Sequence, residues 1–206
     1  MRILIPLLSI FSLAALAGVT RGDPNDPEWQ DGDIVFQASQ SEQSKYIMLA
    51  TGSRLTHVGL IDVRADGVYV VEAVQPVKVT PLATFRSRYD DPRLAVKRVP
   101  GLNEAERRAV VKEARRWVGR DYDRRFGWND SVVYCSELVW KAFDRAVDRQ
   151  ISPLRRFCDF VLVETPIGAE FVARRWGSEG PDPEEQVVSP ADLWRGDGSD
   201  ILVDPF

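Results

Sequence analysis

The stretch Tyr134-Cys135-Ser136-Glu137-Leu138-Val139-Trp140 decides how this sequence is interpreted. Apolar residues recur there at the spacing of one helix face, namely Cys135, Leu138, Val139, Ala142, Phe143 and Ala146. The pattern predicts an amphipathic helix with Cys135 in its first turn. Unpaired backbone N–H groups and the positive end of the helix dipole favour a thiolate there. Cys135 is therefore a candidate nucleophile, and the alternative is a small core residue.

The chain contains one histidine, His57, so Cys–His chemistry within this chain requires that residue. His57 opens an apolar stretch, 57–63, and a second apolar stretch, 68–74, follows the turn signal Asp66-Gly67. These patterns predict a β-hairpin. The second stretch contains one acid, Glu72, among valines and an alanine.

The hairpin has two candidate registers. A four-residue loop pairs Val63 with Val68 and places Gly59 opposite Glu72, whereas a two-residue loop shifts the pairing by two residues. Either register leaves His57 and Glu72 on the same face, because side chains alternate with period two. In the first register they are diagonal neighbours within reach of a glutamate side chain. The alternative for Glu72 is an exposed strand residue.

The N-terminal segment, residues 1–17, resembles a secretory signal peptide. Arg2 precedes the apolar run from Ile3 to Ala17, and Ala15-Leu16-Ala17 fits a cleavage site. The run is short for a membrane span, although a retained anchor is the alternative. Residues 18–29 are polar and predict a linker. We therefore expect an exported protein, periplasmic or secreted, without an integral membrane span after signal cleavage.

The composition predicts one domain over residues 30–206. The 206-residue chain is 44% hydrophobic, enough for a sizeable core, and its net charge of −4 without basic clusters argues against a nucleic-acid partner. One histidine and two cysteines without paired spacing predict no metal site, and no cofactor is expected. In an oxidising compartment Cys135 and Cys158 are able to pair, which would remove the nucleophile. The oligomeric state stays open.

The remaining patterns predict an α+β fold, with an antiparallel sheet and helices to one side. We expect strands at 33–37, 94–99 and 201–203. We expect helices from a cap at Ser39 or Ser41 to Gly52, from Pro81, from Asn103 to Val118, at 167–176, and from Ser189 to Trp194.

The three candidates together predict thiol catalysis. Cys135 attacks a carbonyl, His57 accepts its proton and later protonates the leaving group, and Glu72 orients the imidazole. Backbone N–H groups at the helix start stabilise the oxyanion.

Four segments also resemble the YiiX-like branch of the NlpC superfamily. They are Gly32 to Gln37, Ser53 to Gly59, Val71-Glu72-Ala73-Val74 and the Cys135 stretch, and Val188-Ser189-Pro190 fits as well. The resemblance implies a papain-like fold in circularly permuted order and an amide- or ester-cleaving thiol hydrolase. It carries the nucleophile, base and orienting roles to Cys135, His57 and Glu72. It also suggests that Tyr122 lines the substrate pocket.

The substrate stays open between a peptide and an acyl group. Unpermuted relatives cut cell-wall peptides, and other permuted relatives move acyl chains on lipids. Export favours a cell-wall or other short peptide, whose carboxylate Arg54 or Lys78 would bind, unless both are plain surface charges. A lipid acyltransferase or esterase would need an apolar groove, with candidates Phe126, Trp128, Trp140 and Phe157. A catalytically silent binding module is the third alternative.

Overall fold

The computed structural model describes residues 24, 26–160 and 165–206. The predicted signal peptide 1–17 and part of the predicted linker 18–29 lie outside these residues. The elements, in chain order, are β1 (Ile34–Gln37), α1 (Glu42–Thr51), β2 (His57–Arg64), β3 (Gly67–Glu72), β4 (Lys78–Pro81), α2 (Leu82–Arg86), β5 (Ala95–Arg98), α3 (Glu104–Arg115), α4 (Cys135–Val147), β6 (Arg155–Arg156), the 3₁₀ turn η1 (Phe157–Asp159), α5 (Pro166–Trp176), β7 (Gln186–Val187), α6 (Pro190–Arg195) and β8 (Asp200–Val203).

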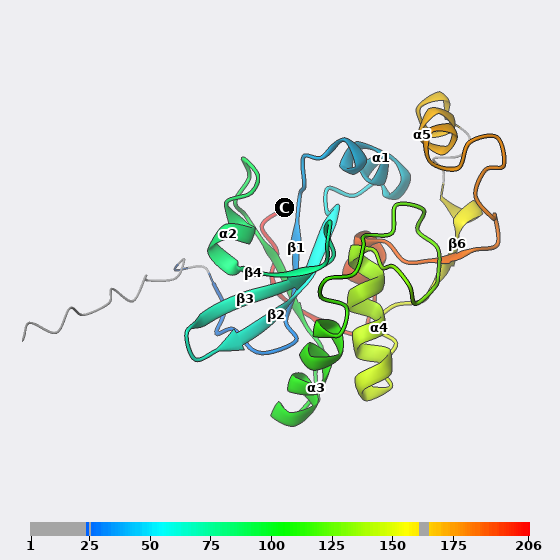
Figure 1. Ribbon diagram of the computed structural model, residues 1–206. Coiled ribbons are helices and arrows are strands. Elements are labelled where there is room, and N and C mark those ends of the chain that lie inside the picture. Colours follow the sequence, from blue (N-terminus) through cyan, green and yellow to red (C-terminus); the bar gives the residue numbers. More distant parts are fainter. Residues whose placement is uncertain (1–23, 25, 161–164) are drawn as a thin grey trace, which may run out of the picture.

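A six-stranded antiparallel sheet, in the order β4-β3-β2-β1-β5-β8, forms the centre of the described chain (Figure 1). The β2–β3 hairpin pairs Val63 with Val68 and Gly59 with Glu72, which confirms the first of the two candidate registers. The pairing continues to Arg64 and Gly67, so the loop contains two residues, 65–66, and not the four predicted for this register. The ladder ends at Glu72, two residues before the predicted end of that strand. A separate two-stranded sheet, β6-β7, lies with α5 at one end of the molecule (Figure 1).

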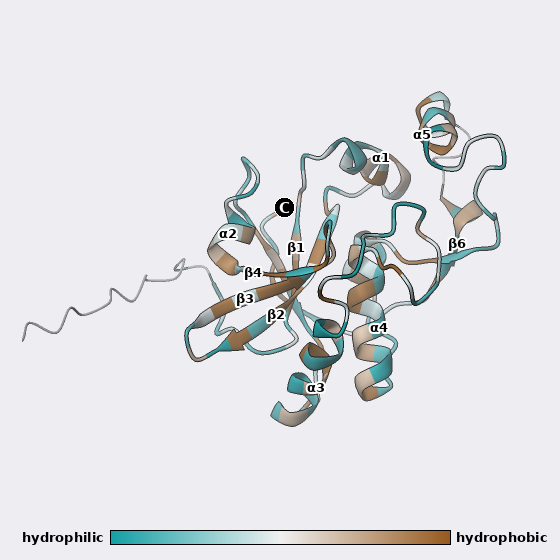
Figure 2. Cartoon of the chain, viewed as in Figure 1, coloured by the Kyte–Doolittle hydropathy of each residue, from teal (hydrophilic) through white to brown (hydrophobic). Residues whose placement is uncertain are grey.

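Both faces of the sheet are covered, so its central strands are apolar on both sides. Along β1, Ile34 and Phe36 pack into the core beneath α3 and α4, while Val35 packs into a second core beneath α2. Figure 2 shows apolar residues concentrated along β2 and β3. The prediction of helices to one side is therefore incomplete, because Leu82 and Phe85 of α2 bury against the opposite face. The α+β class is confirmed.

Helix α4 lies against β2 and α3 and begins at Cys135, as predicted. Leu138 and Phe143 are completely buried, and each contributes about 1.5–3 kcal/mol by leaving water. At the helix start, Glu137 accepts a hydrogen bond from the backbone N–H of Tyr134 at 3.2 Å and pairs with buried Lys141 at 2.6 Å. Glu137 thus stabilises the first turn of α4, which carries Cys135.

The other predicted helices form with small differences. Ser41 and Gly52 cap α1, and Asn103 opens α3 with a capping box, as expected. Helix α3 ends at Arg115, before the predicted Val118, and turns continue to Gly119. Pro81 caps α2 from outside the helix and does not occupy its first position. None of the helices in the described ranges has the length and hydropathy needed to cross a membrane.

Candidate active site

Cys135 occupies the first turn of α4 as a free thiol that is 3% exposed. Its backbone N–H lies among the first four of the helix, which have no intrahelical acceptor. Cys158 is also free, and it is exposed on η1. The disulfide between these cysteines, left open by the sequence, is not formed in this structure.

His57 and Glu72 meet across the hairpin. His57 Nε2 lies 2.7 Å from Glu72 Oε2, and both side chains are buried. The diagonal approach depends on Gly59, which lies opposite Glu72. A Cβ at position 59 would come within 2.5 Å of Val70 Cγ1 and 3.4 Å of Glu72 Cβ. Glycine therefore leaves the space through which the glutamate reaches the imidazole.

The Glu72 carboxylate is fully buried and is held by three donors. Arg88 donates to Oε2 at 2.7 Å and to Oε1 at 2.5 Å, and Thr80 donates to Oε1 at 2.6 Å. Burial alone would raise the pKa of Glu72, but the hydrogen bonds from Arg88, His57 and Thr80 lower it far below its usual range. Glu72 is therefore ionised in the folded protein despite its burial.

His57 and Cys135 line the same cleft, and the thiol is near enough to the imidazole to raise the pKa of His57. Because Nε2 is engaged by Glu72, Nδ1 is the ring nitrogen that remains for the thiol. Burial lowers the pKa of His57, but the hydrogen bonds to Cys135 and Glu72 outweigh it and raise the pKa from 6.5 to about 10. The structure thus brings the three predicted residues into one continuous chain of contacts.

Tyr122, which the resemblance suggested as a pocket residue, lines the same cleft as His57 and Cys135. Its hydroxyl contacts Cys135 and accepts a hydrogen bond from Gln43 Nε2 of α1 at 2.8 Å. Burial, followed by the charge of Cys135, raises the pKa of Tyr122 well above 10, so the hydroxyl keeps its proton. A bridge between Tyr122 and Val133 joins the start of the loop that precedes α4 to the residues directly before this helix.

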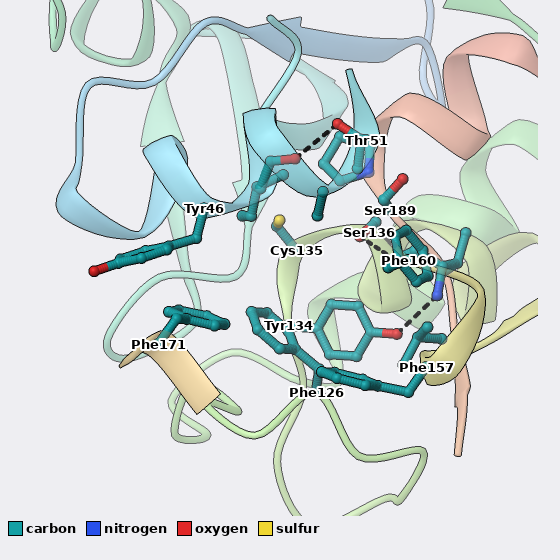
Figure 3. A pocket seen from close by; sticks show the side chains of 15 residues that line it. Tyr46, Thr51, Phe126, Tyr134, Cys135, Ser136, Phe157, Phe160, Phe171 and Ser189 are labelled. Carbon is teal, nitrogen blue, oxygen red and sulfur yellow. Dashed lines mark hydrogen bonds between the residues drawn. The ribbon is translucent and has the colours of Figure 1, made fainter. Parts of the chain in front are cut away.

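Two cavities meet at Cys135. An apolar cavity lies between α1, α5 and the start of α4, and Figure 3 shows Cys135 among its side chains. A larger polar cleft contains His57 and Tyr122 and is bordered by the arginines Arg124, Arg125, Arg174 and Arg175. The nucleophile therefore lies at the boundary of two chemically different spaces.

The two basic residues predicted to bind substrate line neither cavity. Arg54 is 59% exposed, pairs with Asp91 at 3.7 Å and stacks on Phe206. Lys78 lies exposed on β4, opposite Glu72 in the ladder. Arg54 belongs to the bend before β2, and Lys78 belongs to β4, so neither side chain shares the cleft that His57 lines.

The apolar groove considered for a lipid substrate is also composed differently from the prediction. Phe126 and Phe157 line the apolar cavity, together with Phe171 of α5. Trp128 and Trp140 lie outside its lining and pack against each other, with ring centroids 5.2 Å apart. Half of the predicted aromatic set therefore belongs to the hydrophobic core.

Three residues that bind the site were not predicted from the sequence, namely Arg88, Thr80 and Gln43. The sequence did indicate that Glu72 needs a partner such as Arg88, because a buried carboxylate on an apolar strand requires a cation or several hydrogen-bond donors. Nothing in the pattern identified which arginine would supply it, since Arg88 lies 16 residues along the chain from Glu72. Among the described residues, no three His, Cys, Asp or Glu side chains are grouped as a metal site.

Three comparisons with known proteins all match this chain to the same family. The model of a permuted papain-like amidase family, YaeF/YiiX, C92, matches residues 28–201. The chain is 38% identical over 162 residues to the uncharacterized protein YiiX of Escherichia coli K12, covering 78% of this chain and 79% of that protein. The crystal structure of the metalloprotein yiiX from Escherichia coli O157:H7 superimposes with a TM-score of 0.81 at 35% identity, covering 86% of this chain and 98% of the other.

Proposed function

The chain belongs to the permuted papain-like amidase family of YaeF and YiiX, and from this premise we propose that it is an exported thiol hydrolase cleaving an amide bond. Its α+β fold is the papain-like fold of this family. The observation that carries the proposal is the chain of contacts from Cys135 through His57 to Glu72 at the start of α4. A binding module without turnover would not require an ionised, buried Glu72 behind its histidine.

In the proposed reaction the Cys135 thiolate attacks the carbonyl carbon of the amide, forming an S–C bond and an oxyanion. The oxyanion collapses, the C–N bond breaks, and the leaving amine takes a proton from Nδ1 of His57. Neutral His57 then removes a proton from water, which attacks the thioester. The carboxylic acid leaves, and the pair of thiolate and imidazolium is restored. Glu72 holds Nε2 throughout, so the ring keeps its orientation.

Two groups are placed to stabilise the oxyanion. One is the backbone N–H of Cys135, which has no acceptor within its helix. The other is the Tyr122 hydroxyl, which accepts a hydrogen bond from Gln43, so that its own proton is available to the Cys135 thiolate and, after attack, to the oxyanion. The proposed role of Tyr122 is thus donation to the developing charge, beyond lining the pocket.

A cell-wall or other short peptide is the proposed class of substrate. The signal-like segment 1–17 supports export to the compartment where such peptides occur. The arginines of the polar cleft support recognition of carboxylates, in place of Arg54 and Lys78. The apolar cavity supports the second candidate, hydrolysis or transfer of an acyl group by the same three residues.

The relative of known structure is described as a metalloprotein, which raises the question of a resident metal at this site. Among the described residues, Glu72 is the one carboxylate bonded to His57, and its oxygens accept hydrogen bonds from His57, Arg88 and Thr80. A carboxylate occupied in this way is not available as a metal ligand. The described residues do not fit a resident metal, and the proposed mechanism contains no metal step.

The test is the rate of iodoacetamide alkylation at each cysteine, followed by mass spectrometry between pH 5 and 9. Cys158 is exposed and serves as the internal control, since a buried thiol without an activating base reacts more slowly than an exposed thiol. We expect Cys135 to react faster than Cys158 at pH 6, and His57→Ala to slow Cys135 at least tenfold without affecting Cys158. An inert Cys135 beside a reactive Cys158 would refute the proposal.

A further inference from the structure

Resting on the proposed function, we propose that the substrate is an amide with an apolar acyl group and an anionic leaving amine. The acyl group occupies the apolar cavity, and the leaving amine occupies the arginine-lined cleft. The proposal is based on the position of the nucleophile. Cys135 and Ile47 line both spaces, so Cys135 lies where the cavity and the cleft meet.

Apolar side chains form two sides of the apolar cavity. Phe126, Phe157 and Phe171 form one side, and Ile47 and Ala50 of α1 form the other. Their rings are supported from behind, because Phe171 stacks on Tyr46 with centroids 4.4 Å apart, and Phe126 packs edge-on against Tyr134 at 5.3 Å. A preformed apolar space of this kind selects an aliphatic or aromatic group.

The hydroxyl groups around this cavity are already engaged within the protein. Ser136 donates to Val188 O at 2.7 Å, the Tyr134 hydroxyl accepts from Val188 N at 3.1 Å, and Thr51 donates to Ile47 O at 2.8 Å. Figure 3 draws these bonds and shows the Tyr46 hydroxyl pointing away from Cys135. A ligand in the cavity therefore meets carbon surfaces, and a polar ligand would lose its bonds to water without replacement.

The polar cleft has the opposite character. Four arginines border it against one carboxylate, Glu42, which is paired with Arg174 at 2.8 Å. Arg175 is held by Gln43 at 2.7 Å and stacks on Phe171, which fixes it at the boundary between the two spaces. Arg124 and Arg125 are exposed on the loop before α4, and neither side chain forms an ion pair within the described residues. These charges favour an anion.

The position of His57 fixes which part of the substrate occupies which space. The leaving nitrogen must receive its proton from His57, and His57 lines the polar cleft but not the apolar cavity. The leaving amine therefore lies on the arginine side. The acyl carbon bonded to Cys135 then directs its substituent into the apolar cavity. Cleavage of the C–N bond releases the anionic amine first, and water releases the apolar acid from the thioester.

The experiment compares three amides that differ in one feature each. They are N-octanoyl-aspartate, N-acetyl-aspartate with a short acyl group, and N-octanoyl-asparaginamide with an uncharged leaving amine. Release of aspartate or asparaginamide is measured by mass spectrometry. We expect kcat/KM for N-octanoyl-aspartate to exceed that of each of the others at least tenfold.

Matched variants test each space separately. Ala50→Phe fills the apolar cavity and should lower the turnover of N-octanoyl-aspartate at least tenfold, whereas Leu49→Phe, on the exposed side of α1, should not. Arg124→Glu combined with Arg125→Glu should abolish the preference for the charged leaving amine. Arg108→Glu on the exposed surface of α3 is the charge control.

The outcomes separate this inference from the proposed function. Equal turnover of the three amides, or a preference for the acetyl compound, would overturn the bipartite substrate while leaving the thiol hydrolase intact. No turnover of any of them by a protein with a rapidly alkylated Cys135 would also overturn it. An inert Cys135 would instead overturn the proposed function, which the alkylation measurement detects independently.

Discussion

Replacing Glu72 by glutamine should lower the pKa of His57, because it removes the charge that the imidazolium faces. The carboxylate lies 2.7 Å from Nε2 and is completely buried, so solvent screens little of the interaction. Glutamine keeps the shape and one oxygen but carries no charge. Arg88 would then face the imidazolium across a neutral side chain, which adds repulsion.

The magnitude follows from the two partners of the ring. His57 has a pKa of about 10, raised from 6.5 by Cys135 and Glu72. One opposite charge at hydrogen-bonding distance shifts a pKa by about 1–3 units, so the variant should titrate between about 7 and 9. At pH 9 about nine-tenths of the imidazole is protonated at a pKa of about 10, and about one-tenth at a pKa of about 8.

The assay is NMR titration of the imidazole with ¹³C,¹⁵N-labelled histidine. The chain has a single histidine, so one set of resonances reports His57 without assignment, provided that no histidine tag remains. Asp62→Asn is the matched control, since Asp62 is a buried carboxylate paired with Arg64 on the same strand. It lies five residues from His57, about 17 Å along β2.

We expect Glu72→Gln to shift the titration and Asp62→Asn to leave it within about 0.5 pH unit. A wild-type His57 that titrates near 6.5 would refute the reasoning, because the contacts to the thiol and the carboxylate would then not stabilise the charged ring. An unchanged titration in Glu72→Gln would refute it as well, since the raised pKa would have another origin.

Three further substitutions test the surroundings of the site. Tyr122→Phe should lower kcat about 100-fold with p-nitrophenyl butyrate at similar KM, as expected for loss of an oxyanion donor, and an unchanged kcat would exclude that role. Arg88→Gln should lower the free energy of unfolding, measured by urea denaturation, by about 2–3 kcal/mol. The control Arg93→Gln, at an exposed position, should change it by less than about 0.5 kcal/mol. Equal effects of the two substitutions would contradict a stabilising pair between Arg88 and buried Glu72. Gly59→Ala should lower the same free energy of unfolding by about 1–3 kcal/mol, because the added Cβ would lie 2.5 Å from Val70 Cγ1. An unchanged free energy would show that the hairpin backbone shifts to accommodate the methyl group.

Much of the local structure was predictable from the sequence. The alternation of side chains placed His57 and Glu72 on one face in either candidate register, and the structure selects the register with Gly59 opposite Glu72. Helix α4 and the position of Cys135 followed from its apolar spacing. These features depend on neighbours along the chain, and local patterns record them well.

Contacts between distant segments were not predictable in the same way. The sequence suggested that Glu72 belongs with His57, but not that Arg88 and Thr80 would bind its oxygens. It suggested Arg54 and Lys78 as substrate contacts, and the structure places four other arginines at the cleft. An isolated arginine carries no periodic signal, so its partner is known only once the elements have packed.

The sequence by itself determined the family, the fold class and the three residues proposed for catalysis, because short motifs and strand and helix periods encode them directly. Only the tertiary structure decided what surrounds Cys135. The apolar cavity forms where α1, α5 and the start of α4 meet, and the polar cleft forms where His57 approaches the loop before α4. The shape and charge of such spaces are set by the packing of elements far apart in the chain, which no local pattern specifies.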